Sequence, residues 1–226
     1  MSSFRRKSNC NTMTKFIAFE GIDGSGKSTQ LKLLAKSLEI KGLKFICTRE
    51  PGGSEVSEQI RKILVRKQKE NILPLTELLL IYAARYEHLN KKIIPSLKNK
   101  IVLCDRYFYS TYCYQILTSN IPFSTLKYFH SKIANNLMPD LTIVIDLDSQ
   151  IGIKRSLKKK NKETRFEFKD SLFHKKVSIG FKKLKEKKKV EIFSGDKSKN
   201  EIHRNIVDFL NKKKILNKQI PYYYEY

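Results

Sequence analysis

The sequence Gly21-Ile22-Asp23-Gly24-Ser25-Gly26-Lys27-Ser28 fits G-x-x-x-x-G-K-[ST], the pattern of a phosphate-binding loop. A short apolar run at 16–19 precedes it and predicts a buried strand, and the apolar spacing over 29–40 predicts a helix. Glycines let backbone N–H groups approach a phosphate closely, and the helix N-terminus adds positive potential. The stretch therefore predicts a nucleoside triphosphate site, with Lys27 at the β- and γ-phosphates and Ser28 as a ligand of Mg²⁺. A glycine turn that precedes a helix by chance is the alternative.

Apolar runs alternate with helical patterns along the rest of the chain. The runs predict strands at 16–19, 43–48, 101–104, 141–147 and 190–193. The helical patterns lie at 29–40, 55–65, 74–97, 123–136 and 201–213, and Pro95 is expected to interrupt the third of them. Strands without polar alternation, separated by helices, indicate an α/β fold with a five-stranded parallel sheet covered on both faces.

The length of 226 residues suits one domain, which we expect at 15–213. A flexible tail at 1–14 and a C-terminal tail at 214–226 would flank it. No apolar run approaches the 18 residues that predict a membrane span. The four cysteines show no C-x-x-C spacing, which favours a reducing, cytoplasmic setting.

The formal net charge of +24 is the most unusual property of the composition. Half of it arises between Lys154 and Lys189, where 16 Lys or Arg face 4 Asp or Glu. Such a face can bind nucleic acid. Because no zinc-finger spacing or aromatic RNA-binding signature accompanies the charge, we expect a solvated, lysine-rich surface and no nucleic-acid partner.

Asp105 and Arg106 directly follow the strand expected at 101–104. Ligands of parallel α/β sheets bind at the carboxyl ends of the strands, the edge at which the phosphate loop also opens. At this edge Asp105 can order Mg²⁺ and its waters, and Arg106 can hold an acceptor phosphate. The alternative is that Asp105 only caps the next helix.

Three further arginines fall at positions that a phosphoryl-transfer site needs. Arg49, with Glu50, closes the second strand at the same edge. Arg85 follows a pair of alanines that would let a ligand approach closely, although a surface arginine is the alternative. Arg165 interrupts a lysine-rich region with a planar fork that suits a migrating phosphoryl group.

The chain resembles the bacterial type of thymidylate kinase from about residue 15 to residue 211. The resemblance rests on FEGIDGSGKSTQ (19–30), TREPGG (48–53), YAAR (82–85), DRY (105–107), ST (110–111), YQ (114–115) and PDLT (139–142). It implies a P-loop NTPase fold with a small basic helical lid at about 153–168. It also implies a homodimeric enzyme that phosphorylates dTMP to dTDP with ATP and Mg²⁺, for dTTP synthesis.

The resemblance assigns roles to particular residues. The implied ATP-binding residues are Gly21, Ile22, Asp23, Gly24, Ser25, Gly26, Lys27, Ser28 and Thr29. The implied dTMP-binding residues are Asp23, Arg49, Glu50, Ile81, Arg85, Arg106, Thr111 and Gln115. The implied catalytic residues are Lys27, Asp23, Arg106, Arg165 and, as a second lid candidate, Arg155, with Ser28 and Asp105 at the metal. Asp23 would accept a hydrogen bond from the sugar 3′-hydroxyl, and Thr111 and Gln115 would read the thymine edge.

Two positions depart from related sequences. Gly24 stands where the other branch of the family carries an arginine, so the lid must supply the catalytic arginine. Ile81 stands where the family usually stacks a phenylalanine on thymine. The alternatives are a kinase for another nucleoside or nucleotide and, in a different class, an ATP-gated nucleic-acid-binding module.

Overall fold

Five parallel strands form the single sheet of this computed structural model, which describes residues 14–66, 69–158, 165–166 and 168–224. Their order is β2-β3-β1-β4-β5, which confirms the expected α/β architecture. The strands are β1 (Phe16–Glu20), β2 (Phe45–Arg49), β3 (Ile101–Asp105), β4 (Leu141–Asp146) and β5 (Val190–Ser194). Residues 1–13 of the tail expected at 1–14, and residues 159–164 and 167 of the expected lid, lie outside the described residues.

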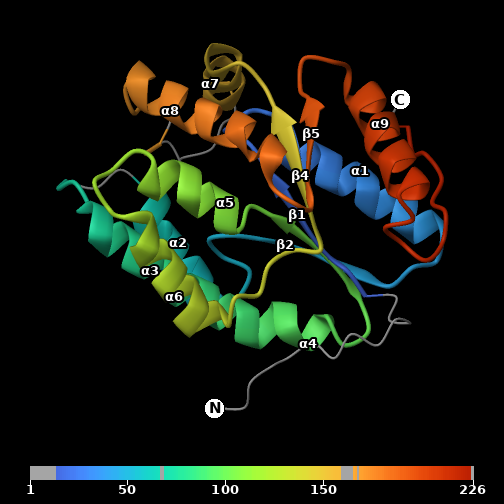
Figure 1. Cartoon of the computed structure of the whole chain (residues 1–226), viewed down its shortest axis with the longest axis horizontal. Coiled ribbons are helices and arrows are strands. Elements are labelled where there is room, and N and C mark those ends of the chain that lie inside the picture. The colour runs from blue at the N-terminus through green and yellow to red at the C-terminus, as the bar shows by residue number, and fades with distance from the viewer. Residues whose placement is uncertain (1–13, 67–68, 159–164, 167, 225–226) are drawn as a thin grey trace.

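Helices cover both faces of this sheet, as Figure 1 shows, with α1 and α9 on one side and α2 to α6 on the other. The helices before β3 are α1 (Lys27–Ile40), α2 (Glu55–Val65), α3 (Pro74–His88), the π-helical η1 (Leu89–Ile93) and α4 (Ile94–Ser96). Those between β3 and β4 are α5 (Phe108–Thr111), the π-helical η2 (Tyr112–Ile116) and α6 (Phe123–Ala134). Beyond β4 come α7 (Ser149–Leu157), α8 (Ser171–Lys182), the 3₁₀-helical η3 (Lys183–Glu186) and α9 (Lys199–Lys212).

The central strand β1 is buried on both faces, so its five residues carry no polar alternation. Ile17 and Phe19 belong to the apolar cluster under α1 and α9. Phe16 and Ala18, which point the other way because side chains alternate along a strand, join the cluster under α3, α4 and α6. β1 therefore links the two halves of the core.

The strand order brings the carboxyl ends of β1, β2 and β3 to one edge. β3 pairs with both neighbours, and the register sets Asp105 beside Phe19 and beside Arg49. The chain passes from β1 to β2 and returns to β3 between them, while β4 adds on the other side of β1. The edge next to β1 is thus the switch point at which α/β folds bind ligands.

Two segments can be compared with what the sequence predicts. The third helical pattern is interrupted close to Pro95, as expected: its irregular part is the π-helical turn η1, which directly precedes α4. Proline has no N–H for the helical ladder, and a π turn is one way in which a helix absorbs such a defect. The segment expected as a C-terminal tail buries Leu216 and Ile220 in the core cluster under α9. Asn211 holds it there through two hydrogen bonds of 2.9 Å with the backbone of Ile220.

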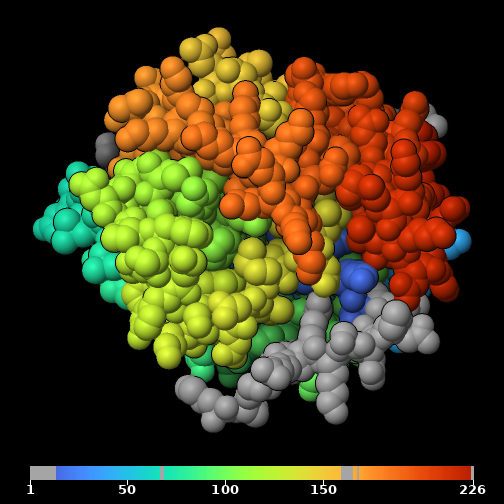
Figure 2. Space-filling model, viewed as in Figure 1, coloured from blue at the N-terminus to red at the C-terminus, as the bar shows by residue number. Residues whose placement is uncertain are grey.

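The segment between β4 and β5 passes over the same side of the sheet as α5. α8 packs against η2, and the two segments lie as adjoining surfaces in Figure 2, orange against yellow-green. Phe181 and Val177 of α8 share an apolar cluster with Cys113 and Tyr114 of η2. In the part of the chain that the structure describes, each helix is too short or too polar to cross a lipid bilayer.

Candidate active site

The phosphate loop between β1 and α1 depends on glycines in the left-handed region. Gly21, Gly24 and Gly26 have φ of 135°, 74° and 100°, values that side chains with a Cβ rarely adopt. A Cβ on Gly21 or Gly24 would also strike a backbone carbonyl oxygen, that of Ile145 or Gly152. The loop can therefore form only with glycine at these positions.

A Cβ on Gly24 would meet the backbone of a second glycine, Gly152 of α7. A Cβ on Gly152 would in turn lie 2.6 Å from the carbonyl oxygen of Asp23. This contact leaves no room for a side chain at position 24 and fixes the start of α7 against the loop. Packing thus explains why position 24 is a glycine and not an arginine. The expected consequence is that the lid must supply the catalytic arginine.

Lys27 and Ser28, the last two residues of the motif, occupy the first turn of α1. The Nζ of Lys27 donates to the carbonyl oxygen of Ile22 at 2.6 Å, across the loop. Burial, followed by the positive charge of Arg106, lowers the pKa of Lys27 to about 8. The Ser28 hydroxyl donates to Oδ2 of Asp105, so the expected hydroxyl and carboxylate ligands of a metal meet at the end of β3.

Arg106 directly follows β3 and joins the loop to the neighbouring cleft. Its φ of 70° is in the left-handed region, a strained conformation that non-glycine residues adopt chiefly at functional sites. The guanidinium donates to Oδ1 of Asp23 at 2.5 Å, to the carbonyl oxygen of Gly21 at 3.1 Å and to Oγ of Ser110 at 3.0 Å. It also lies over the ring of Tyr114, 5.0 Å from the ring centre.

The Asp23 carboxylate is the counter-charge of this arginine. Burial alone would raise its pKa, but the positive charges of Arg106 and Lys27, with a 2.8 Å hydrogen bond from the Tyr114 hydroxyl, hold the pKa at about 2. The same carboxylate, through its attraction, places the pKa of Arg106 well above the usual value even though burial opposes this. Both groups are therefore charged at neutral pH.

A cleft of ≈ 730 Å³, measured with its open mouth, begins at this ion pair and runs between α2, α3 and the α5–η2 segment. Its lining residues are Asp23, Glu50, Pro51, Arg61, Leu64, Val65, Ile81, Arg85, Arg106, Tyr107, Ser110, Thr111, Tyr114, Gln115 and Phe166. Seven of the eight residues expected to bind dTMP lie among them: Asp23, Glu50, Ile81, Arg85, Arg106, Thr111 and Gln115.

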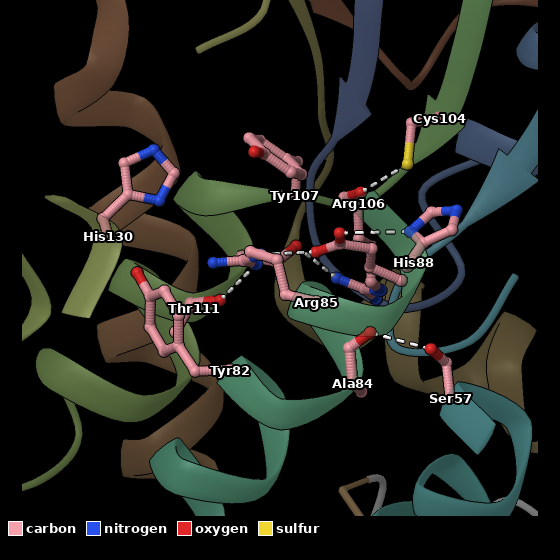
Figure 3. Close-up of polar contacts among 12 residues, drawn as sticks. Ser57, Tyr82, Ala84, Arg85, His88, Cys104, Arg106, Tyr107, Thr111 and His130 are labelled. Carbon is pink, nitrogen blue, oxygen red and sulfur yellow. Dashed lines mark hydrogen bonds and ion pairs between the residues drawn. The ribbon is translucent and has the colours of Figure 1, made fainter. Parts of the chain in front are cut away.

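Arg85 is a buried charge that lines the cleft, and Figure 3 shows its contact with Thr111. Its side chain, 1% exposed, donates from Nε to Glu50 at 2.7 Å and from Nη2 to the Thr111 hydroxyl at 2.9 Å. The rings of Tyr82 and Tyr107 lie 4.9 and 4.7 Å from the guanidinium carbon. Nη1 is buried and has no hydrogen-bond partner among the residues that the structure describes.

Glu50 is held from its other side by His88, which sequence reasoning did not identify. The imidazole lies between Oε1 of Glu50 at 3.2 Å and the Thr48 hydroxyl at 2.6 Å. Burial would raise the pKa of Glu50, but Arg85 and His88 lower it. A Cβ on Gly53, whose φ is 89°, would strike the same imidazole, which explains the glycine at this turn. The only signal for His88 is its spacing on α3, three residues beyond Arg85.

Three expected arginines bind protein groups outside the phosphate loop. Arg49 is half exposed, forms an ion pair with Glu58 at 2.9 Å, and is outside the cleft lining. Arg155 of α7 donates to the carbonyl oxygen of Gly195 at 3.4 Å. Arg165 donates to Glu77 and, at 2.8 Å, to the carbonyl oxygen of Leu64, which sets the lid against the cleft wall.

Two more residues shape the site without a clear sequence signal. Glu20, the last residue of β1, is fully buried and accepts hydrogen bonds from the backbone N–H groups of Tyr107 and Ser110 at 2.9 and 3.1 Å. It thereby fixes the start of α5 to β1. Phe166 lines the cleft with its ring edge-on to Tyr114 at 5.7 Å, and so adds an aromatic wall to a cleft in which Ile81 offers none.

In this chain a phosphate loop and a neighbouring cleft share one arginine, Arg106. This arrangement is typical of phosphotransferases of the P-loop class. The family profile described as thymidylate kinase matches residues 19–206. The chain belongs to the thymidylate kinase family.

Individual relatives agree with this assignment. The chain is 41% identical to a thymidylate kinase of Wolbachia pipientis over 206 residues, which is 88% of this chain and 97% of the relative. It is 42% identical to one of Geotalea daltonii, over 77% of this chain and 85% of the relative. The crystal structure of a thymidylate kinase from Ehrlichia chaffeensis superposes with a TM-score of 0.69 at 33% identity, and covers 87% of this chain and 98% of that one.

The lowered pKa of Lys27 predicts a pH-dependent affinity for triphosphate. Phosphate raises the pKa of a contacting ammonium, so above about pH 8 binding must take up a proton and weakens, by roughly tenfold per pH unit. Calorimetric titration of a non-hydrolysable ATP analogue between pH 7 and 9.5, in buffers of different ionisation enthalpy, measures both the affinity and the proton uptake. Lys27→Ala should remove the dependence. An affinity that is flat over this range contradicts the assignment.

Proposed function

We propose that this chain transfers the γ-phosphoryl group of ATP to dTMP, with the triphosphate on the loop and the acceptor in the cleft. The observation that carries this proposal is the contact of Arg106 with Asp23. It joins the phosphate loop to a cleft whose other end holds the buried Arg85 and the polar pair Thr111 and Gln115. An acceptor that lies along this cleft presents its phosphate to Arg106 and its base to Arg85. A nucleoside monophosphate has its phosphate at one end and its base at the other, as this orientation requires.

The reaction needs alignment more than covalent help from the protein. An oxygen of the acceptor phosphate attacks the γ-phosphorus of ATP as the bond to the β-phosphate oxygen breaks, giving dTDP and ADP. Lys27 and Arg106 stand on the two sides of Asp23 and neutralise the charge that gathers between the nucleotides. Asp23 accepts a hydrogen bond from the sugar hydroxyl and keeps Arg106 oriented. Catalysis is mainly this preorganisation.

The loop residues suit a magnesium ion. Ser28 and Asp105 offer a hydroxyl and a carboxylate oxygen in direct contact with each other, and oxygen ligands are the ones that Mg²⁺ prefers. Ser28 and Asp105 would hold the ion together with phosphate and water oxygens. When bound, the ion supplies charge neutralisation at the β- and γ-phosphates. Among the described residues no group of three acidic, His or Cys side chains forms a metal cage, so the nucleotide itself must complete the coordination.

We propose that Arg165 supplies the catalytic cation of the lid, and Arg155 is the second candidate for this role. For Arg165 to reach the γ-phosphoryl group, it must exchange Glu77 and the Leu64 carbonyl for phosphate oxygens. We assign the contacts that Arg165 makes here to the arrangement before the lid closes. Closure of the lid would then exclude water and prevent hydrolysis of ATP.

An acceptor panel tests the function. With ATP and Mg²⁺ we expect the highest kcat/KM for dTMP and a value for dUMP that is lower by about 10- to 200-fold, because the two bases differ by one methyl group. dCMP should be poorer still. A coupled assay of ADP release gives the rates, and Lys27→Ala serves as the inactive control. A chain that prefers another acceptor, or transfers nothing to dTMP, contradicts the proposal.

Arg165→Ala tests the lid assignment. If Arg165 acts at the γ-phosphoryl group in the closed state, the change lowers kcat and kcat/KM together by about 100-fold or more, with little effect on ATP affinity. Arg165→Lys should rescue poorly because an ammonium lacks the planar fork. Arg204→Ala, on α9 beyond the other face of the sheet, is the matched control. A raised KM for dTMP at unchanged kcat would instead show that Arg165 only supports the cleft wall.

We further propose a cytoplasmic homodimer. α2 and α3 pack together and present an apolar outer surface: Val56, Ile63, Leu75, Leu79 and Tyr86 are each 45–49% exposed. Apolar patches on adjoining helices mark interaction sites, and a symmetric dimer is the commonest way to cover one. The buried free thiols Cys104 and Cys113 suit a reducing compartment.

Leu79→Glu tests the dimer. A charge in the centre of the α2–α3 patch should convert the chain to a monomer at micromolar concentration, while Ile40→Glu, at an exposed site on α1, should leave the assembly unchanged. Light scattering after size-exclusion chromatography gives the mass. If the parent chain is a monomer, or if both variants keep the parent's dimer, this surface is not the interface.

A further inference from the structure

Glu77 contacts both the base end of the cleft and the lid, yet it is not one of the cleft-lining residues. It lies in the first turn of α3 and is 7% exposed. Its Oε1 accepts a hydrogen bond of 2.7 Å from Nε2 of Gln115. Its Oε2 accepts one from the guanidinium of Arg165. One buried carboxylate therefore holds the amide expected to read the base and the arginine expected to close the lid.

The contact with Glu77 fixes which end of the Gln115 amide faces the ligand. A carboxylate accepts hydrogen bonds and cannot donate them, so only the nitrogen of the amide can face Glu77. The reverse orientation would set two acceptor oxygens against each other in a buried place. Gln115 lines the cleft and Glu77 lies behind it, so the carbonyl oxygen of Gln115 is the end left for a ligand.

Arg85 supplies the opposite polarity in the same cleft lining, because a guanidinium only donates hydrogen bonds. Its Nη2 is bonded to Thr111, one helical turn before Gln115. The base end of the cleft therefore presents a donor group and an acceptor oxygen. A pyrimidine with a 4-oxo group and an N3–H matches this pair. Cytosine, which has a 4-amino group and an unprotonated N3, presents the reverse pattern.

We propose that Glu77 is a positioning residue that sets base selectivity: by fixing the amide of Gln115, it makes the site accept thymine and uracil and reject cytosine. Arg165 binds the second carboxylate oxygen in the arrangement seen here, before the lid closes. The proposal rests on the proposed function, since it concerns the acceptor base of that same site.

Glu77→Gln tests the proposal with an almost isosteric change. Arg165 only donates hydrogen bonds, so it will bind the carbonyl oxygen of the new amide and turn the new NH₂ group toward Gln115. Gln115 must then reverse and present its own NH₂ to the cleft, where it meets the N3 of cytosine. dUMP and dCMP differ only along this edge, so the ratio of their kcat/KM values isolates the effect. We expect this ratio to fall at least tenfold, with dTMP falling in parallel with dUMP.

Two further variants separate positioning from a structural role. Glu87→Gln makes the same change on the same helix, away from these contacts, and should leave the dUMP to dCMP ratio at the parent value. Arg165→Gln removes the ion pair but keeps the carboxylate, so the ratio should stay within a few-fold of the parent whatever happens to the rate. If Glu77→Gln melts at too low a temperature to assay, Glu77→Ala, which leaves Gln115 free to rotate, should also lower the ratio.

The outcome that overturns the proposal is a Glu77→Gln enzyme that loses activity on dTMP, dUMP and dCMP in the same proportion. Calorimetric affinities for dUMP and dCMP give the same comparison without turnover. Failure of the wider function is distinguishable, because in that case the parent chain itself would not phosphorylate dTMP.

Discussion

The contact between Arg106 and Asp23 is the interaction on which the rest of this site depends. One residue belongs to the phosphate loop after β1 and the other follows β3, and the two strands are neighbours only because β2 is displaced to the sheet edge. The strained backbone of Arg106 turns its side chain back over the loop toward the Gly21 carbonyl. The phosphate loop and the cleft thus share one charged wall.

Each of the three buried glutamates that the structure describes binds more than one polar group. Glu50 serves Arg85 and His88, Glu77 serves Gln115 and Arg165, and Glu20 caps the turn at Ser110. An unpaired buried charge is costly, whereas a paired and hydrogen-bonded one holds its partners in a single geometry. In each set the glutamate orients a residue that lines the cleft; Glu50 is itself part of the lining, whereas Glu20 and Glu77 are not. The lining residues can therefore meet a ligand already in position, as preorganised catalysis requires.

The sequence predicted the parts of this structure that local chemistry determines. Loop glycines, buried strands and residues at strand ends follow from backbone conformation and the parallel topology, so Lys27, Ser28 and Asp105 could be placed in advance. His88, Glu77 and Phe166 could not, because their roles arise from contacts across more than 30 residues of sequence. Nor could the sequence show that Arg49 would pair with Glu58 outside the cleft, since a charge at a strand end can turn toward either side.

In the proposed function one arginine, Arg106, joins the triphosphate site to the acceptor cleft. A crystal structure with dTMP, Mg²⁺ and a non-hydrolysable ATP analogue tests it most directly. We expect the acceptor phosphate to contact Arg106 and the sugar hydroxyl to contact Asp23. The base should lie against Arg85, with its N3 at the carbonyl oxygen of Gln115. An acceptor bound outside the cleft, or a base directed toward the phosphate loop, would contradict it.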